Sequence, residues 1–127
     1  MFSLAYKLKV RFRGGAGVNP NDDQKCLDAV HEALQVIGSK WAFAVISQLY
    51  YRPQRFNPLR RSLGGISIKS LTDVLRHLER HQMVKRRVFP TTPVSVEYSL
   101  TEKGREYRAI LLQMRQWGEK WIAERME

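Results

Sequence analysis

Residues 67–76 combine short hydroxyl side chains with long cations in one stretch, SIKSLTDVLR. Serine and threonine hydroxyls hydrogen-bond to bases or phosphates at close range, and lysine and arginine reach phosphates or the acceptor edge of guanine. If these residues share one exposed face, that face could contact DNA. A solvated helix surface without a partner has a similar composition, and this is the alternative. The residues concerned are Ser67, Lys69, Ser70, Thr72 and Arg76.

The whole chain has an excess of positive charge. Its 127 residues include 22 Lys and Arg against 12 Asp and Glu, a net charge of +10 at neutral pH. Most of the excess lies before residue 101, and a polyanion is the natural partner for it. Charge alone is equally compatible with a merely soluble basic protein. One domain is expected at this length.

A tight turn at Gly64 and Gly65 separates two predicted helices. The first lies within RFNPLRRSL at residues 55–63, with Asn57 as its predicted N-cap and Pro58 at the first helical position. A short stripe that is expected to be buried precedes the glycines and consists of Leu59 and Leu63.

The second helix is predicted to begin at Ser67, with Ser70 and Asp73 as an alternative capping pair one turn later. The polar side chains of this helix must point outward if its apolar residues pack inward. A short helix, a glycine turn and a second helix that exposes hydroxyls and cations match the helix-turn-helix pattern of DNA-binding proteins. The inward residues are predicted to be Ile68, Leu71, Leu75 and Leu78.

A β-hairpin is predicted directly after the second helix. Two alternating runs at residues 84–89 and 94–100 flank the segment PTTP. A helix-turn-helix followed by such a hairpin is a winged helix, whose wing is expected to lie along the phosphate backbone or an adjacent minor groove. The hairpin side chains concerned are the cations Lys85, Arg86 and Arg87 at the base and the hydroxyls Thr91 and Thr92 at the tip.

Two further helices are predicted between residues 26 and 51. The first begins near Cys26 and ends at Gly38, its expected C-terminal cap. The second covers residues 40–51, with Ser39 as its cap, and is expected to run through the core because it is apolar nearly all round. The apolar face of the first helix consists of Leu27, Val30, Ala33, Leu34 and Ile37.

A long last helix is predicted from its cap, Thr101, to about Arg125. Its apolar stripe is wide and aromatic, and core packing accounts for only part of it. Two tryptophans this late in a small chain favour burial against a second subunit, so a homodimer paired through helices is expected. The stripe consists of Tyr107, Ile110, Leu111, Met114, Trp117 and Trp121.

Residues 1–25 are expected to form a basic extension outside the domain at 26–127. Apolar and basic residues alternate over residues 2–13, which predicts a strand, and residues 14–24 are interpreted as a glycine-rich linker. The strand could pair within its own or a partner subunit, reach DNA as an arm, or be unstructured. Pairing is our expectation, because an exposed edge strand with one apolar face would risk aggregation.

Catalysis, a metal and a cofactor are not expected. The loop GGAG has Pro20 where the third glycine of a dinucleotide-binding fingerprint belongs. His77 and His81 have the spacing of a helical ligand pair, yet no third ligand is evident. No apolar run approaches the ~20 residues of a membrane span, and the single cysteine excludes an intrachain disulfide. We expect a cytoplasmic protein without membrane contact.

Several segments in this order and spacing resemble the HxlR-type winged helix-turn-helix transcriptional regulators, relatives of the MarR group. The resemblance runs from Cys26 to about Trp121. It implies a mainly helical α+β fold, a winged helix-turn-helix with a two-stranded wing and N- and C-terminal dimerisation helices. The segments are IGSKW at 37–41, RFNPLRRSLGGIS at 55–67, KSLTDVLRHLERHQMVKRRVFPTTPVSVEYSLTEKG at 69–104, and the late Trp117.

The resemblance implies a dimeric bacterial regulator, commonly a repressor, that binds double-stranded DNA. The helix from Ser67 would enter the major groove, the 84–100 hairpin would be the wing, and the terminal helices would pair with the first helix of the domain. The alternative is a non-specific nucleoid-binding or protein-interaction module with the same fold. By position the family places Ser67, Lys69, Ser70, Arg76, Thr91 and Thr92 at DNA, with Lys40, Arg52 and Arg55 as backbone contacts. The expected dimer residues are Leu27, Val30, Ile110, Met114, Trp117 and Trp121.

Members of this family often sense electrophiles, oxidants or aldehydes through a cysteine at the start of the domain's first helix, and Cys26 lies near that place. The family commonly has Cys-Pro slightly closer to the glycine of its GGKW element, whereas Cys26 lies twelve residues before Gly38 and precedes Leu27. Lys25 and the helix N-terminus could raise the reactivity of the thiol; a half-buried structural thiol is the alternative. A sensing Cys26 would form an intersubunit disulfide or an adduct with a small reactive inducer.

Overall fold

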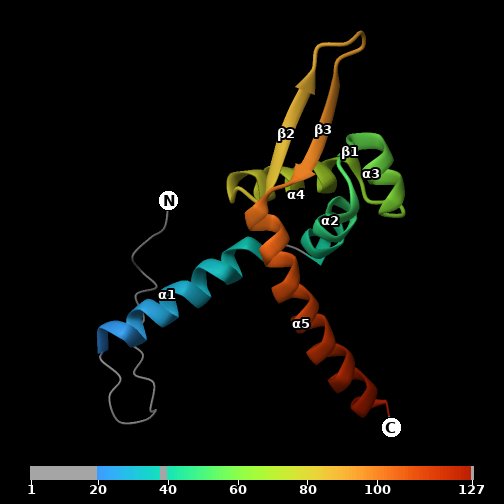
Figure 1. Ribbon diagram of the computed structural model, residues 1–127. Helices are drawn as coiled ribbons and strands as arrows, with labels where there is room; N and C mark the ends of the chain where they lie inside the picture. Colours follow the sequence, from blue (N-terminus) through green and yellow to red (C-terminus); the bar gives the residue numbers. More distant parts are fainter. Residues whose placement is uncertain (1–19, 38–39, 127) are drawn as a thin grey trace. The chain divides into compact units, whose positions relative to one another are not determined.

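The structure is a computed structural model that describes residues 20–37 and 40–126. The chain divides into two units between Val36 and Ile37. The expected mainly helical α+β fold is confirmed, with a three-stranded antiparallel sheet among the described residues (Figure 1). In chain order the elements are α1 (Pro20–Ile37), α2 (Lys40–Tyr51), β1 (Gln54–Arg55), α3 (Phe56–Ser62), α4 (Ile68–Arg80), β2 (Val84–Phe89), β3 (Ser95–Leu100) and α5 (Glu102–Arg125).

Helix α1 begins earlier than the sequence predicts. Residues 20–24, part of the predicted linker, are helical, so the linker interpretation is wrong for them. Proline is favoured at the first helical position, and Asp22 and Asp23 stabilise the positive end of the helix dipole. The predicted strand at 2–13 and the predicted caps at Gly38 and Ser39 lie outside the described residues.

Helices α3 and α4 form the predicted helix-turn-helix. Gly64 and Gly65 have φ angles of 61° and 104°, which glycine adopts at little cost, so the chain can reverse between the helices. Ser67 caps α4 as predicted, because its Oγ accepts a hydrogen bond from the Ser70 amide at 3.0 Å. The side chain of Arg60 supports the turn by donating to the Ile66 carbonyl at 2.9 Å.

The start of α3 corrects one prediction. The helix begins at Phe56, with Arg55 in the cap position and no side-chain capping bond, so the predicted Asn57 cap is wrong. Arg55 is extended because it belongs to β1 and pairs with Glu97 of β3. Pairing in the sheet, and not a side-chain cap, determines where the chain enters this helix.

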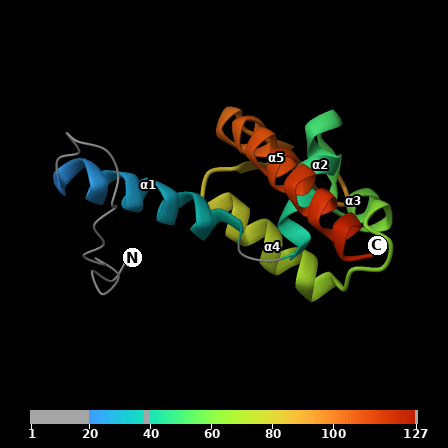
Figure 2. The same ribbon diagram turned by 90° about the horizontal axis from the view of Figure 1, so that it is seen from below.

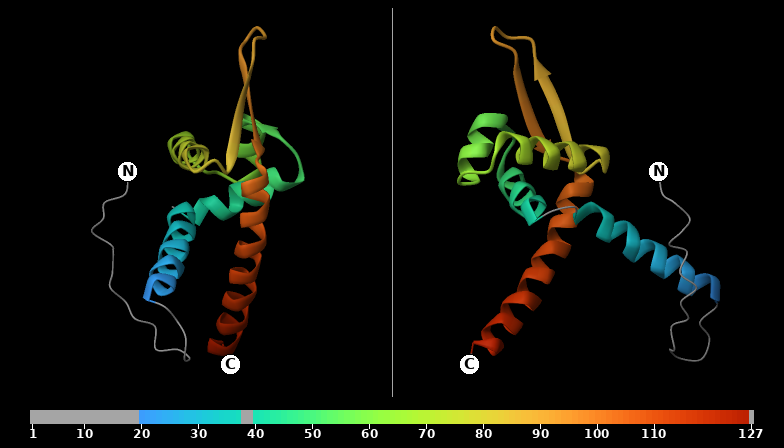
Figure 3. Two further views of the ribbon diagram at one scale, coloured as in Figure 1. Left: turned by 60° about the vertical axis from the view of Figure 1, so that its left-hand side comes forward. Right: turned by 180° about the vertical axis from the view of Figure 1, so that it is seen from behind.

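The wing is formed by β2 and β3, which pair antiparallel with Val84 opposite Leu100 and Phe89 opposite Ser95. The short strand β1, which was not predicted, pairs with the other edge of β3, so the strand order is β1-β3-β2. Figures 1 and 3 show the hairpin and α5 extending in opposite directions from α2, α3 and α4. The expected two-stranded wing therefore has a third strand at its base.

The core of the second unit lies among α2, α3, α4, the base of the hairpin and the first half of α5. Helix α5 runs beside α2 (Figure 2). The prediction that Ile68 packs inward is wrong, since 60% of it is exposed. As the first residue of α4, Ile68 lies beyond the buried stripe, and Val74 is buried instead. The buried stripe of α4 consists of Leu71, Val74, Leu75 and Leu78, and that of α2 of Ala42, Val45, Ile46 and Leu49.

Candidate nucleic-acid interface

The exposed cations of α4 are Lys69 and Arg76. The Lys69 side chain is 87% exposed, and its Nζ lies 3.2 Å from the Asp73 carboxylate, which is also largely exposed. An exposed pair one helical turn apart contributes little to stability, so Lys69 can exchange Asp73 for a phosphate or a base at low cost. Arg76, two turns after the cap, is exposed as predicted.

The hydroxyls of α4 are partly used by the helix itself. Ser67 Oγ donates to Ser70 Oγ at 2.9 Å while it caps the helix. Thr72 Oγ1 donates to the Ile68 carbonyl at 2.7 Å. Each oxygen can still accept a further hydrogen bond, but Ser67 and Thr72 use their protons within the chain.

Exposed Ile68 is a candidate contact that the sequence analysis missed. It lies beside Lys69 at the N-terminal end of α4. An apolar side chain on a helix in the major groove can contact the methyl group of thymine. Its position directly after the Ser67 cap is the signal that could have indicated exposure, because a residue in the first turn can lie outside the buried stripe.

The base of the wing meets α4 at Tyr98. Arg86 lies opposite Tyr98 in the sheet and hydrogen-bonds to its hydroxyl. Burial raises the pKa of Tyr98 above its usual value, and the positive charges of Arg86 and Arg76 oppose this shift. Arg86 is therefore held by Tyr98, whose hydroxyl also experiences the charges of Arg76 and Glu79 of α4.

The other face of the sheet gathers two cations that are far apart in the sequence. Arg55 of β1 and Arg87 of β2 lie opposite Glu97 from its two neighbouring strands. Both guanidinium groups also lie over the ring of Phe89, at 5.8 Å and 4.7 Å from its centroid. Thr91 and Thr92 are exposed at the tip of the hairpin, where they were predicted.

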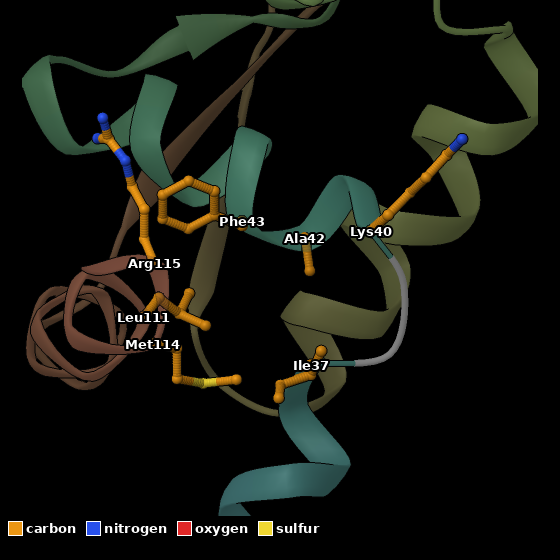
Figure 4. A pocket seen from close by; sticks show the side chains of 7 residues that line it. All are labelled: Ile37, Lys40, Ala42, Phe43, Leu111, Met114 and Arg115. Atoms are coloured by element: carbon orange, nitrogen blue, oxygen red, sulfur yellow. The ribbon is translucent and has the colours of Figure 1, made fainter. Parts of the chain in front are cut away.

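Lys40, a predicted backbone contact, lines an apolar pocket of about 320 Å³ between α2 and α5. Figure 4 shows Lys40 pointing away from the apolar side chains of Phe43, Leu111 and Met114. Lys40 is exposed, as is Arg52 near the end of α2. The structure does not bring Lys40 together with the cations of the wing.

The apolar stripe of α5 divides between core and surface. Tyr107 and Leu111 are buried, whereas the four stripe residues expected at a dimer interface are exposed, Trp117 by 69%. On α1, Leu27 is half-buried, and Val30 is exposed. Cys26 is free and exposed, which differs from the half-buried structural thiol considered above. The four exposed stripe residues are Ile110, Met114, Trp117 and Trp121.

Comparison with known proteins identifies the fold and the family. The model of the HxlR-like helix-turn-helix family matches residues 36–126. The chain belongs to this family. The expected membership of this family is therefore confirmed, and so is the winged helix-turn-helix fold of this HxlR-like chain.

The relatives of this HxlR-like chain are named as transcriptional regulators. The Bacillus subtilis HTH-type transcriptional regulator YvaP is 34% identical over 80% of this chain and 94% of its own length. A MarR-family regulator structure from Enterococcus faecalis has a TM-score of 0.68 at 32% identity, over 79% of this chain and 91% of that one. The structure of the redox regulator HypR in its oxidized form has a TM-score of 0.64 at 42% identity, over 72% of this chain and 95% of that one. None of the helices that the structure describes is long and apolar enough to cross a membrane.

Proposed function

We propose that this protein is a sequence-specific, DNA-binding transcriptional regulator. The observation that carries the proposal is helix α4, which is capped by Ser67 and presents Lys69 and Arg76 to solvent next to a basic wing. In this proposal α4 enters the major groove, where Lys69, Arg76 and Ile68 contact base edges. The wing cations Arg86 and Arg87, with Thr91 and Thr92, contact the flanking backbone. The naming of the relatives as transcriptional regulators supports this assignment.

The proposed active form is a homodimer. The tryptophans of α5 are exposed, and so is Val30 of α1; a second copy would cover these apolar side chains. A twofold dimer places two recognition helices about 34 Å apart, one turn of the duplex, so that each reads a half-site. We propose repression as the outcome, because a dimer held on a promoter occludes it.

The experiment compares the protein's own upstream DNA with scrambled DNA by fluorescence anisotropy over a series of salt concentrations. Lys69→Ala and Arg76→Ala are each expected to weaken binding to the upstream DNA by about 1–3 kcal/mol if they contact bases. The control is Lys103→Ala, which removes an exposed cation from α5. Equal affinities for the two DNAs with parallel salt dependence would instead favour a non-specific nucleoid-binding module, because phosphate contacts carry no sequence information.

We also propose that Cys26 makes DNA binding sensitive to oxidants. The thiol is exposed and lies on the second turn of α1, and the relative HypR is named as a redox regulator. Diamide would oxidise one thiolate from each of two chains to an intersubunit disulfide and would itself be reduced to the hydrazine.

Treatment with diamide is expected to release the DNA and to produce a dimer on a non-reducing gel. Dithiothreitol should reverse both effects, and Cys26→Ser should show neither. An unchanged response of the Cys26→Ser protein would contradict a sensing role for this thiol.

A further inference from the structure

A groove of about 770 Å³ lies between α3 and the wing. It opens where β1 ends, because β1 covers the edge of β3 only at Tyr98 and Glu97. No acidic residue is among the side chains that line it. From the α3 side the lining includes Arg55, Asn57 and Arg61, and from the wing it includes Thr91, Thr92 and Ser95.

The groove has two cations, Arg61 and Arg55, and their side chains make different contacts within the chain. Arg60 supports the helix-turn-helix by its bond to the Ile66 carbonyl. The side chain of Arg61, the next residue, is exposed and has no hydrogen bond or ion pair within the described part of the chain. Arg55 is oriented by the Phe89 ring, which also lies under Arg87. The groove thus has one oriented cation and one cation without a structural role.

One hydroxyl of the groove also lacks a partner. Ser95 lies opposite Phe89 in the sheet, and its Oγ is buried without a hydrogen-bond partner in the described structure. A buried hydroxyl without a partner is unfavourable, and an oxygen-rich ligand would satisfy it. Cations and hydroxyls without carboxylates are the donors that phosphate oxygens require.

We propose that this groove binds a phosphodiester group of the DNA backbone, with Arg61 and Arg55 as its charged contacts. The inference rests on the proposed DNA-binding function and extends the backbone contacts proposed for the wing to the groove beside α3. Arg61 would be a backbone contact that the sequence did not indicate. Phe89 would be a positioning residue that acts through Arg55.

The test compares Arg61→Gln with Lys103→Gln, which removes the same charge from an exposed site outside the groove. Binding of the full-length protein to upstream and scrambled duplexes is measured by anisotropy from 50 to 200 mM salt. The slope of log K against log salt is negative, and loss of one phosphate contact lowers its magnitude by about 0.9. Arg61→Gln should therefore lose roughly threefold more affinity at the low-salt end than at the high-salt end. Both duplexes should be affected equally, and Lys103→Gln should leave the slope unchanged.

A second measurement tests the role of Phe89. Phe89→Tyr keeps an aromatic ring under Arg55 and should retain the wild-type slope, whereas Phe89→Leu should lower it; circular dichroism checks that both variants fold. Equal slopes for Arg61→Gln and Lys103→Gln would overturn the groove site. If Lys69→Ala and Arg76→Ala leave binding unchanged but Arg61→Gln lowers the slope, the groove stands and the proposed orientation of α4 fails.

Discussion

Gly104 illustrates how a single residue joins two elements of the fold. It is buried in the first turn of α5, where a Cβ atom would meet the Met83 carbonyl and lie 2.6 Å from Leu100 Cδ1. Met83 precedes β2 and Leu100 ends β3, so the backbone of α5 can approach the base of the wing only without a side chain at this position. Gly118 of the same helix has open space at its Cβ position.

Gly104→Ala is therefore expected to lower the free energy of unfolding by about 1–3 kcal/mol, the usual effect of overpacking. Gly118→Ala is the matched control and should raise it by about 0.5–1 kcal/mol, because alanine favours helix over glycine. Urea denaturation followed by circular dichroism measures both changes. Equal effects of the two substitutions would contradict the close approach at Gly104.

At the scale of elements, Thr101 connects the wing to α5. Its Oγ1 accepts a hydrogen bond from the Gly104 amide at 3.1 Å and donates to the Gln82 carbonyl at 2.7 Å. Its own amide donates to the Met83 carbonyl at 3.0 Å. One side chain thus caps the last helix and holds the chain segment that leads into the hairpin.

Thr101→Ala is expected to destabilise the protein by about 1–2 kcal/mol, at the upper end of the range for N-caps because a second bond is lost with the cap. Thr101→Ser retains the hydroxyl and should recover most of the loss. The midpoint temperatures of thermal unfolding measure the stabilities of the two variants. If Thr101→Ser is as unstable as Thr101→Ala, packing of the methyl group and not hydrogen bonding would be the main contribution.

At the scale of the whole molecule, the second half of α5 has apolar side chains that the chain itself does not cover. Trp117 and Trp121 lie 6.3 Å apart by ring centroid on one face of the helix, which also carries exposed Met114. Large exposed aromatic surface is typical of association sites. The proposed dimer would therefore depend on this face of α5, with Val30 of α1, and not on the helix-turn-helix or the wing.

Trp117→Glu is expected to weaken dimerisation by about 2 kcal/mol or more, because it removes an anchor and places a charge in the interface. Gln116→Glu adds the same charge at an exposed position on a different face of α5 and should leave the dimer intact. Analytical ultracentrifugation measures the two dissociation constants. A stable dimer of the Trp117→Glu protein would place the interface elsewhere.

The helix-turn-helix, the hairpin and the long last helix could be predicted from the sequence because their signals are local. The Ser67 and Thr101 caps, the turn at Gly64 and the alternation of the hairpin strands each depend on residues a few positions apart. The outward direction of Lys69 and Arg76 follows from the same periodicity.

Only the tertiary structure decided which residues of the candidate interface meet. The sheet register joins Arg55 to Arg87 across Glu97 and ties Arg86 to Tyr98. The pairing of β1 moves the start of α3 away from Asn57. Where α4 extends beyond its buried stripe, Ile68 becomes exposed. These features depend on contacts between distant segments, and the spacing of residues along one element contains no information about such contacts.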